Sequence, residues 1–171
     1  MRGEVVAIHI ASGAGQPMQG LSAAEAHAGE GLSGDRYRDG VGFYSAVPTD
    51  PGARELTLIA EEALEEVLAE TGITLHLHEH RRNITTRGID VDALLGQRFR
   101  IGEVICEGVR ACPPCNHLDE VTGKAVLKPL VHRGGLRARI VEGGWLHVGD
   151  AIQPLVHVPA ELPSQERLNL V

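Results

Sequence analysis

Short apolar runs separated by glycine limit the folds that this chain can adopt. It holds 21 glycines among 171 residues. Runs of β-branched or alternating apolar residues, typical of strands, lie at residues 5–10, 98–101, 104–109, 136–142, 145–148 and 151–153. Gly143-Gly144 separates two of these runs and predicts a hairpin turn. Many short strands joined by turns predict a mainly β, closed, barrel-like fold.

One segment, near residues 58–70, has the periodicity of an amphipathic helix. Ile59, Ala63 and Val67 fall on one stripe, and glutamates occupy the opposite face. Gly72 follows the last periodic residue and predicts the end of the helix. We therefore expect one clear helix in an otherwise β-rich chain.

The next segment predicts a strand that carries histidines. Leu75 and Leu77 alternate with His76, His78 and His80, which places the three histidines on one face of the strand. Such a face either binds a metal ion or is simply an exposed polar surface.

Composition and charge exclude several classes of protein. Hydrophobic residues make up 43% of the chain, and the formal net charge is -7, which disfavours nucleic-acid binding through bulk charge. No apolar run approaches the ~18 residues of a membrane span. Three cysteines and no export signal indicate a cytoplasmic protein. We expect a single domain over residues 1–154 and a tail over 155–171.

The most unusual segment runs from Arg110 to Leu118. It follows the predicted strand at 104–109 and contains Cys112-Pro113-Pro114-Cys115-Asn116-His117. Two consecutive prolines restrict φ and remove two backbone donors, so we expect a stiff turn that presents Cys115. The nearby Arg110 favours the thiolate, which is the nucleophilic and metal-binding form of cysteine.

The residues alone leave four interpretations of these cysteines open. A thioredoxin-like pair requires a βαβ setting that the pattern lacks. A zinc site would use Cys112, Cys115 and His117, whereas a closed structural site needs four ligands. The other two are a turn with a half-buried cysteine and a single functional thiolate that binds a soft metal or attacks a substrate.

Arginine-rich segments bracket the cysteines. Residues 81–88 read Arg-Arg-Asn-Ile-Thr-Thr-Arg-Gly, and residues 132–137 read His-Arg-Gly-Gly-Leu-Arg. Guanidinium groups bind phosphate and carboxylate in a bidentate manner, so these segments predict an anion site. Surface ion pairs are the alternative. Gly34-Asp35-Arg36 is a weaker signal, in which Asp35 pairs with Arg36 or with an arginine of the other segments.

The order of these motifs resembles the MOSC domain. The motifs are Gly31 to Arg36, Arg81 to Thr85, Leu95 to Gly102, Arg110 to Leu118, Arg133 to Leu136, and Gly149-Asp150. MOSC domains lie at the C-terminus of molybdenum cofactor sulfurases, and also occur in molybdenum-dependent amidoxime-reducing proteins and as stand-alone bacterial proteins. The resemblance extends over residues 5–153 and implies a β-rich barrel with few helices.

The resemblance also implies a single family cysteine, which ligates molybdenum in the reductase branch. It matches Cys115, in the pattern Pro-Cys-X-X-Leu; alignment on the Asp-X-X-Thr-Gly that begins at Asp119 would place Cys112 there instead. The family's anion-holding arginine matches Arg81, beside Asn83.

Further cofactor-binding residues are expected from their chemistry. They are Thr85, Arg87 and Arg133, with Asp35 and Arg36 ordering the floor of the pocket.

The function that the resemblance implies is binding of a molybdenum–pterin cofactor, or transport of sulfur as a Cys115 persulfide. The protein would then be a molybdenum-dependent oxidoreductase, able to reduce N-hydroxylated compounds, or a sulfur-transfer protein. The chain shows neither the pyridoxal-phosphate-dependent desulfurase domain nor the pterin-holding N-terminal β domain of larger relatives, so a cysteine desulfurase or a reductase is the expected partner. The alternative is a non-catalytic module that binds an anion or a partner protein through the same arginines.

Overall fold

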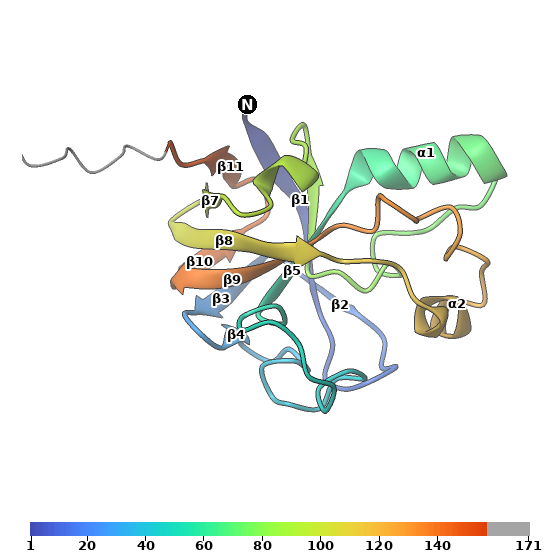
Figure 1. Cartoon of the computed structure of the whole chain (residues 1–171), viewed down its shortest axis with the longest axis horizontal. Helices are drawn as coiled ribbons and strands as arrows, with labels where there is room; N and C mark the ends of the chain where they lie inside the picture. The colour runs from blue at the N-terminus through green and yellow to red at the C-terminus, as the bar shows by residue number, and fades with distance from the viewer. Residues whose placement is uncertain (157–171) are drawn as a thin grey trace, which may run out of the picture.

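A closed barrel of seven strands forms the centre of the computed structural model, which describes residues 1–156 (Figure 1). The barrel strands are β1 (Gly3–Ile10), β5 (Leu56–Ala60), β6 (Ile84–Arg87), β7 (Arg98–Ile101), β8 (Val104–Ala111), β9 (Leu136–Glu142) and β11 (Ala151–Pro154). Their order is β11-β7-β8-β9-β5-β6-β1, and pairing of β1 with β11 closes the ring. Only β5 and β6 pair in parallel. The predicted mainly β, barrel-like fold is confirmed.

The other strands form an extension and a small second sheet. The extension is β2 (Gln19–Leu21), which pairs with β1. The second sheet has the order β10-β3-β4 and consists of β3 (Ala23–His27), β4 (Gly31–Leu32) and β10 (Gly144–His147).

The predicted hairpin at Gly143-Gly144 is wrong, because β10 pairs with β3 rather than with β9. A Cβ at Gly143 would lie 2.5 Å from the carbonyl oxygen of Ala26. Gly143 is therefore needed because the chain passes close to β3 at this position. In the sequence, a glycine required by such a non-local contact looks the same as a glycine required by a turn.

The predicted helix begins three residues later than expected. Leu58 to Ala60 belong to β5, where they pair with Ile84 to Thr86 of β6, and the helix α1 spans Glu61–Thr71. The apolar spacing continues from β5 into α1, so the pattern does not show where the strand ends and the helix begins. The expected end is confirmed: Gly72 has φ 72, and its N–H donates to the carbonyl of Leu68 at 2.8 Å.

The predicted strand that begins near residue 73 is absent, and the histidines do not share a face. A turn forms instead, in which the N–H of His76 donates to the Glu79 carboxylate at 2.7 Å. His76 and His78 are exposed and stack on each other, whereas His80 is fully buried. Within residues 1–156, no group of three or more metal-binding side chains forms a site.

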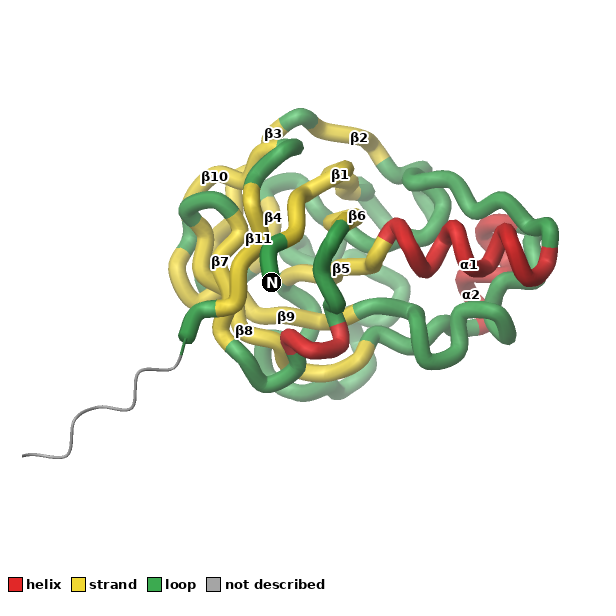
Figure 2. Tube along the Cα trace, turned by 90° about the horizontal axis from the view of Figure 1, so that it is seen from above, coloured by secondary structure: helices red, strands yellow, loops and turns green. Residues whose placement is uncertain are grey.

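Two hydrophobic cores organise the molecule. One fills the barrel, and its largest fully buried side chain is Phe99. The other joins α1 and α2 (Asn116–Thr122), which lie at the same end of the barrel (Figures 1 and 2). Its members are Ile59, Leu64, Val67, Leu75, Leu118, Val126 and Leu130, and the partly buried Cys115 packs against it. The second core therefore fixes the cysteine segment against the barrel.

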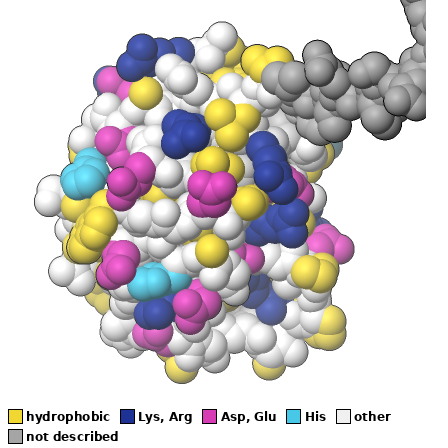
Figure 3. Space-filling view, turned by 90° about the vertical axis from the view of Figure 1, so that its left-hand side faces the viewer, with side chains coloured by type: hydrophobic (Ala, Val, Ile, Leu, Met, Phe, Trp, Pro, Cys, Tyr) yellow, Lys and Arg dark blue, Asp and Glu magenta, His cyan; other side chains and the backbone are white. Residues whose placement is uncertain are grey.

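The face of the barrel opposite the helices carries charges of both signs. Figure 3 shows basic and acidic side chains interspersed on that face of the barrel.

A single 3-10 turn (Asp92–Leu94) lies between β6 and β7. None of the helices within residues 1–156 has the length and apolar character needed to cross a bilayer. Most of the predicted tail, with His157, lies outside the described residues.

Candidate functional site

A pocket of about 250 Å³ opens between the loop that precedes β5 and the segment that leads from β8 into α2. Its lining contains no aspartate or glutamate. It does contain six arginines: Arg36, Arg54, Arg81, Arg82, Arg110 and Arg137. Because the whole chain has a net charge of -7, this concentration of positive charge runs against the overall balance. A cleft lined by one sign of charge attracts ligands of the other sign, so the pocket suits an anion.

Cys115 is the most accessible of the three cysteines, and it lines this pocket. Cys112 also borders the pocket, but only 2% of its surface is exposed. Cys106 lies in the barrel core, where burial raises its pKa to about 12. Reagents and ligands in the pocket therefore reach Cys115 first.

Aromatic side chains surround the Cys115 thiol. Burial, and then the neighbouring Cys115 side chain, raise the pKa of Tyr44 to about 12. Phe43 stacks on His117 with ring centroids 3.8 Å apart. Burial, followed by the charge of Arg81, lowers the pKa of His117. The loop residues Phe43 and Tyr44 thus hold the cysteine segment from the opposite wall.

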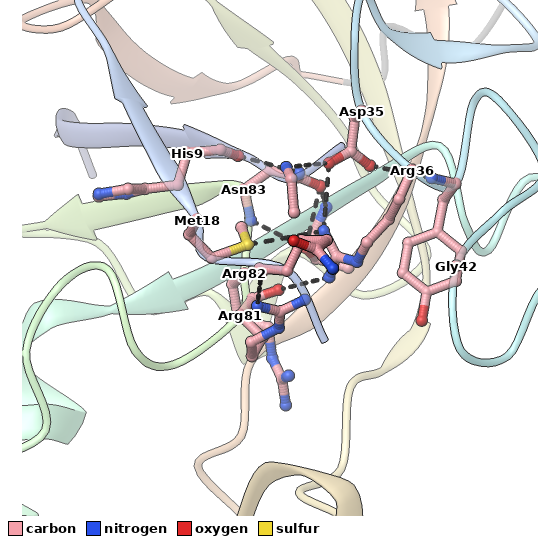
Figure 4. Close-up of polar contacts among 12 residues, drawn as sticks. His9, Met18, Asp35, Arg36, Gly42, Arg81, Arg82 and Asn83 are labelled. Carbon is pink, nitrogen blue, oxygen red and sulfur yellow. Dashed lines mark hydrogen bonds and ion pairs between the residues drawn. The ribbon is translucent and has the colours of Figure 1, made fainter. Parts of the chain in front are cut away.

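Asp35 and Arg36 pair with each other, and Arg36 lines the pocket (Figure 4). The Arg36 guanidinium lies 3.1 Å from the Asp35 carboxylate and also donates to the carbonyl of Arg81 at 3.2 Å. Asp35 further accepts the N–H groups of Ala11 and Tyr37. Both side chains are buried, so this pair connects three separate segments beneath the pocket.

Arg81 lies in the pocket with an uncommon backbone conformation. Its φ is 66, in the left-handed region that costs about 1–3 kcal/mol for a non-glycine residue. Its guanidinium donates to the carbonyl of Gln16. Burial, and then the charge of Arg36, lower the pKa of Arg81 to about 10, so it remains a cation at neutral pH. A cation held in this way beside Arg36 is suited to an anionic partner.

Arg82 instead supports the cysteine loop. Its guanidinium donates to four backbone carbonyls, those of Gly134 at 2.9 Å and of His80, Cys112 and Pro113 at 3.3 Å. The side chain is buried. These contacts use the guanidinium for structure, and they connect the two predicted arginine segments through the Cys112-Pro113 turn.

His80 completes this support as a neutral side chain. Its Nδ1 accepts the N–H of Arg82 at 2.9 Å, so the ring proton lies on Nε2 and is donated to the Thr85 hydroxyl at 2.8 Å. Burial, with the charge of Arg82 second, holds the pKa of His80 well below its ordinary value.

Acidification from about pH 7.5 to about pH 5.5 is expected to cost about 1.4 kcal/mol of stability through His80. Below about pH 6.5 the unfolded chain gains a proton on this histidine that the folded chain does not bind, so stability falls as pH falls. His80→Asn keeps an acceptor for the Arg82 N–H but cannot titrate, and should show a smaller loss. Urea unfolding at both pH values measures the difference; equal losses in the two proteins would contradict this explanation.

The remaining pocket arginines bind the loop over residues 45–54. Arg54 donates to the carbonyls of Ser45 and Val47, and Arg137 donates to the carbonyl of Ala53 at 3.3 Å. Arg110 lies 3.6 Å from the Asp50 carboxylate. This loop forms one wall of the pocket.

The family model of the MOSC domain matches residues 20–153 of this sequence. The chain belongs to the MOSC domain family. Its motif order and its barrel agree with that assignment, and the resemblance stated from the sequence is confirmed. No curated protein matches this MOSC protein.

Solved structures share the barrel of this MOSC domain. The YuaD protein from Bacillus subtilis superposes with a TM-score of 0.75 at 16% identity, over 90% of this chain and 96% of that chain. YiiM from Geobacillus stearothermophilus has a TM-score of 0.67 at 13% identity, over 90% of this chain and 75% of that one. YiiM from Escherichia coli gives 0.65 at 15% identity, with coverage of 92% and 71%. At these identities the likeness shows the fold.

Several residues expected in the site of this MOSC domain lie elsewhere. Arg87 is exposed and bonds Glu61 at 2.6 Å, and Arg133 bonds Glu66 and Glu70 of α1. The opposite charges of the helix hold both arginines away from the pocket.

Asn83 and Thr85 are buried beside the pocket rather than in it. The Asn83 side chain accepts the N–H and hydroxyl of Thr57 and donates to the carbonyl of His9. Thr85 contacts His80, as described above. Asn83 therefore connects β1 to β5, and its polar atoms are used inside the protein.

The sequence analysis missed Phe43, Tyr44 and Arg54 as site residues. They lie on the loop that precedes β5, and they line the pocket. The available signal was the pair of adjacent aromatic residues, in a chain that is only 3% aromatic. Arg137 was part of a predicted segment, and the structure does bring it into one pocket with Arg81 and Cys115.

Proposed function

We propose that this MOSC protein binds a molybdenum–pterin cofactor, with Cys115 as the protein's sulfur ligand or as a carrier of sulfur toward the cofactor. The observation that supports the proposal is an accessible thiol in a pocket that six arginines line without a carboxylate. The location that we propose is the cytoplasm, because all three cysteines are unpaired and a reducing compartment keeps them so.

The residues of the pocket fit this cofactor chemically. A cysteine thiolate is a soft ligand, and guanidinium groups bind a phosphate ester by charge and by hydrogen bonds. The pocket volume of about 250 Å³ is slightly below the range of ~300–1,000 Å³ that is usual for small-molecule sites. We infer that the pocket encloses the metal-binding end of the cofactor and that a partner or the protein surface covers the rest.

In this proposal each group has a separate task. Arg36 and Arg81 bind the cofactor phosphate, while Arg82 holds the cysteine turn through its carbonyls. Tyr44 lies beside Cys115 and would donate its hydroxyl proton to the sulfur. The bound molybdenum centre supplies the oxidation–reduction chemistry, for which N-hydroxylated compounds are the proposed substrates.

In the sulfur-carrier form of the proposal, Cys115 reacts with a partner cysteine desulfurase. The Cys115 thiolate attacks the outer sulfur of the partner's persulfide. A sulfur–sulfur bond forms on Cys115, the partner's sulfur–sulfur bond breaks, and the partner leaves as a thiolate. Cys115 is only partly buried, so its sulfur can reach the partner's persulfide.

Cys115→Ser is expected to remove molybdenum from protein that is expressed with ample molybdate. Elemental analysis should show a molybdenum content more than tenfold below that of the wild type, because a hydroxyl replaces the soft thiolate ligand. Cys112→Ser is the matched control, since Cys112 is buried and should leave the metal content within about twofold. Wild-type protein without molybdenum would argue against the ligand role, and a loss confined to Cys112→Ser would transfer the role to Cys112.

Labelled sulfur from a desulfurase tests the carrier form of the proposal. Wild type and Cys112→Ser should accept the label, and Cys115→Ser should not.

The alternative function is a non-catalytic module that binds an anion or partner through the same arginines. It predicts that the double variant Cys112→Ser/Cys115→Ser keeps the biological activity of the protein in cells, which would exclude both thiol roles.

A further inference from the structure

Two arginines of the pocket lie directly opposite each other on neighbouring strands. Arg110 of β8 pairs with Arg137 of β9 in the sheet register, and both side chains line the pocket. Like charges in this arrangement repel and destabilise a sheet. A third cation, Arg54, lines the same pocket. We call Arg54, Arg110 and Arg137 the outer arginines.

The protein itself neutralises the outer arginines poorly. Asp50 lies 3.6 Å from Arg110, but their side chains are 61% and 47% exposed, so water screens the pair. Arg54 and Arg137 contact neutral carbonyls of the loop over residues 45–54. Within residues 1–156, neither of them has a carboxylate partner. The outer arginines therefore keep most of their charge for a ligand.

The outer arginines have different partners from Arg36 and Arg81. Arg36 pairs with Asp35, and Arg81 donates to the carbonyl of Gln16. Arg54 and Arg137 are instead held by carbonyls of the loop over residues 45–54. The pocket that contains Cys115 therefore has two groups of arginines, each held by its own set of partners.

We propose that the outer arginines form a second anion subsite, which binds a phosphate, sulfate or carboxylate group of the substrate beside Cys115. Such a group would bridge the opposed Arg110 and Arg137 and remove their repulsion. The assignment to a substrate rests on the function proposed above, in which Arg36 and Arg81 bind the cofactor phosphate. The presence of the subsite itself rests only on the geometry of the outer arginines.

Inorganic phosphate is the probe, and thermal unfolding of the purified protein is the measurement. At ten times its dissociation constant, phosphate should raise the Tm of the wild type by about 3–5 °C, as a single bound ligand does in a domain of this size. Sodium chloride at equal ionic strength should not reproduce this shift. An equal shift with chloride would mean charge screening only and would overturn the proposal.

Arg137→Gln should weaken phosphate binding at least tenfold, because it deletes one of the two opposed guanidinium groups. Arg139→Gln is the matched control: it makes the same change on the same strand, but Arg139 lies outside the pocket lining and bonds Glu107. Arg110→Gln is the second variant, since Arg110 is exposed and its loss should not impair folding. Unchanged phosphate binding in both Arg110→Gln and Arg137→Gln would overturn the subsite.

A molybdenum-loaded sample separates the two sources of the anionic group. If the subsite serves the substrate, loaded wild type still binds phosphate and Arg137→Gln still retains molybdenum. If loaded wild type no longer binds phosphate, the cofactor fills the subsite and the substrate assignment fails. A protein that binds phosphate but never molybdenum would retain the subsite and overturn the proposed function alone.

Discussion

Arg82→Ala lowers the free energy of unfolding by about 3–5 kcal/mol, the range expected when a buried hydrogen-bond network is broken. The Arg82 guanidinium bonds four backbone carbonyls in three segments that are distant in sequence. Its removal leaves buried acceptors without donors, each costing about 1–3 kcal/mol before water enters. The turn at Cys112 and Pro113 loses its support, so we also expect Cys112 to become reactive toward thiol reagents.

Urea unfolding and timed thiol labelling measure the two effects of Arg82→Ala. Arg87→Ala is the control, because Arg87 is 54% exposed and bonds the side chains of Glu4 and Glu61 rather than buried carbonyls. Its loss should change stability by no more than about 1 kcal/mol and leave Cys112 protected. Equal losses in the two variants would show that the carbonyl contacts of Arg82 contribute little.

Gly135→Ala should also lower the free energy of unfolding by about 3–5 kcal/mol, in this case because of a steric clash. Gly135 has φ 107, and a Cβ there would lie 2.0 Å from the carbonyl oxygen of Leu58. Either β5 or the chain before β9 must then move. The carbonyl of Gly135 also accepts the N–H of Cys112 at 2.8 Å, so the movement would reach the cysteine turn.

Gly96→Ala separates the clash at Gly135 from backbone strain. Gly96 also has a positive φ, 71, but a Cβ there would meet nothing within 4 Å. Its substitution should therefore cost only the left-handed conformation, about 1–2 kcal/mol. Urea unfolding of the two variants measures the difference. Similar losses of stability would mean that β5 moves to accommodate the new Cβ at little cost in free energy.

Much of the barrel could be predicted from local pattern. The strands over residues 98–101 and 136–142 have the expected bounds, and the end of α1 at Gly72 follows from a glycine at a left-handed position. The failures share one cause. Gly143 and the residues around Leu58 are shaped by contacts with distant strands, and local periodicity does not contain those contacts.

The candidate site divides in the same way. A stiff turn that presents Cys115 follows from two prolines, and the structure has that turn at the pocket. The arginines could not be sorted from sequence, because Arg81 and Arg87 occur in one segment with similar surroundings. Arg87 bonds Glu61 of α1, whereas Arg81 lines the pocket and donates to the carbonyl of Gln16.

By itself, the sequence determined the family, the barrel class and a proline-restricted cysteine turn between two arginine segments, since these depend on residue type and order. Only the tertiary structure decided which arginines meet. The register of β8 against β9 places Arg110 opposite Arg137, and the loop before β5 brings Arg54, Phe43 and Tyr44 to the same pocket as Cys115. The physical reason is that strand register and loop packing bring together residues far apart in the chain, whereas local patterns record only which side of a strand or helix is apolar.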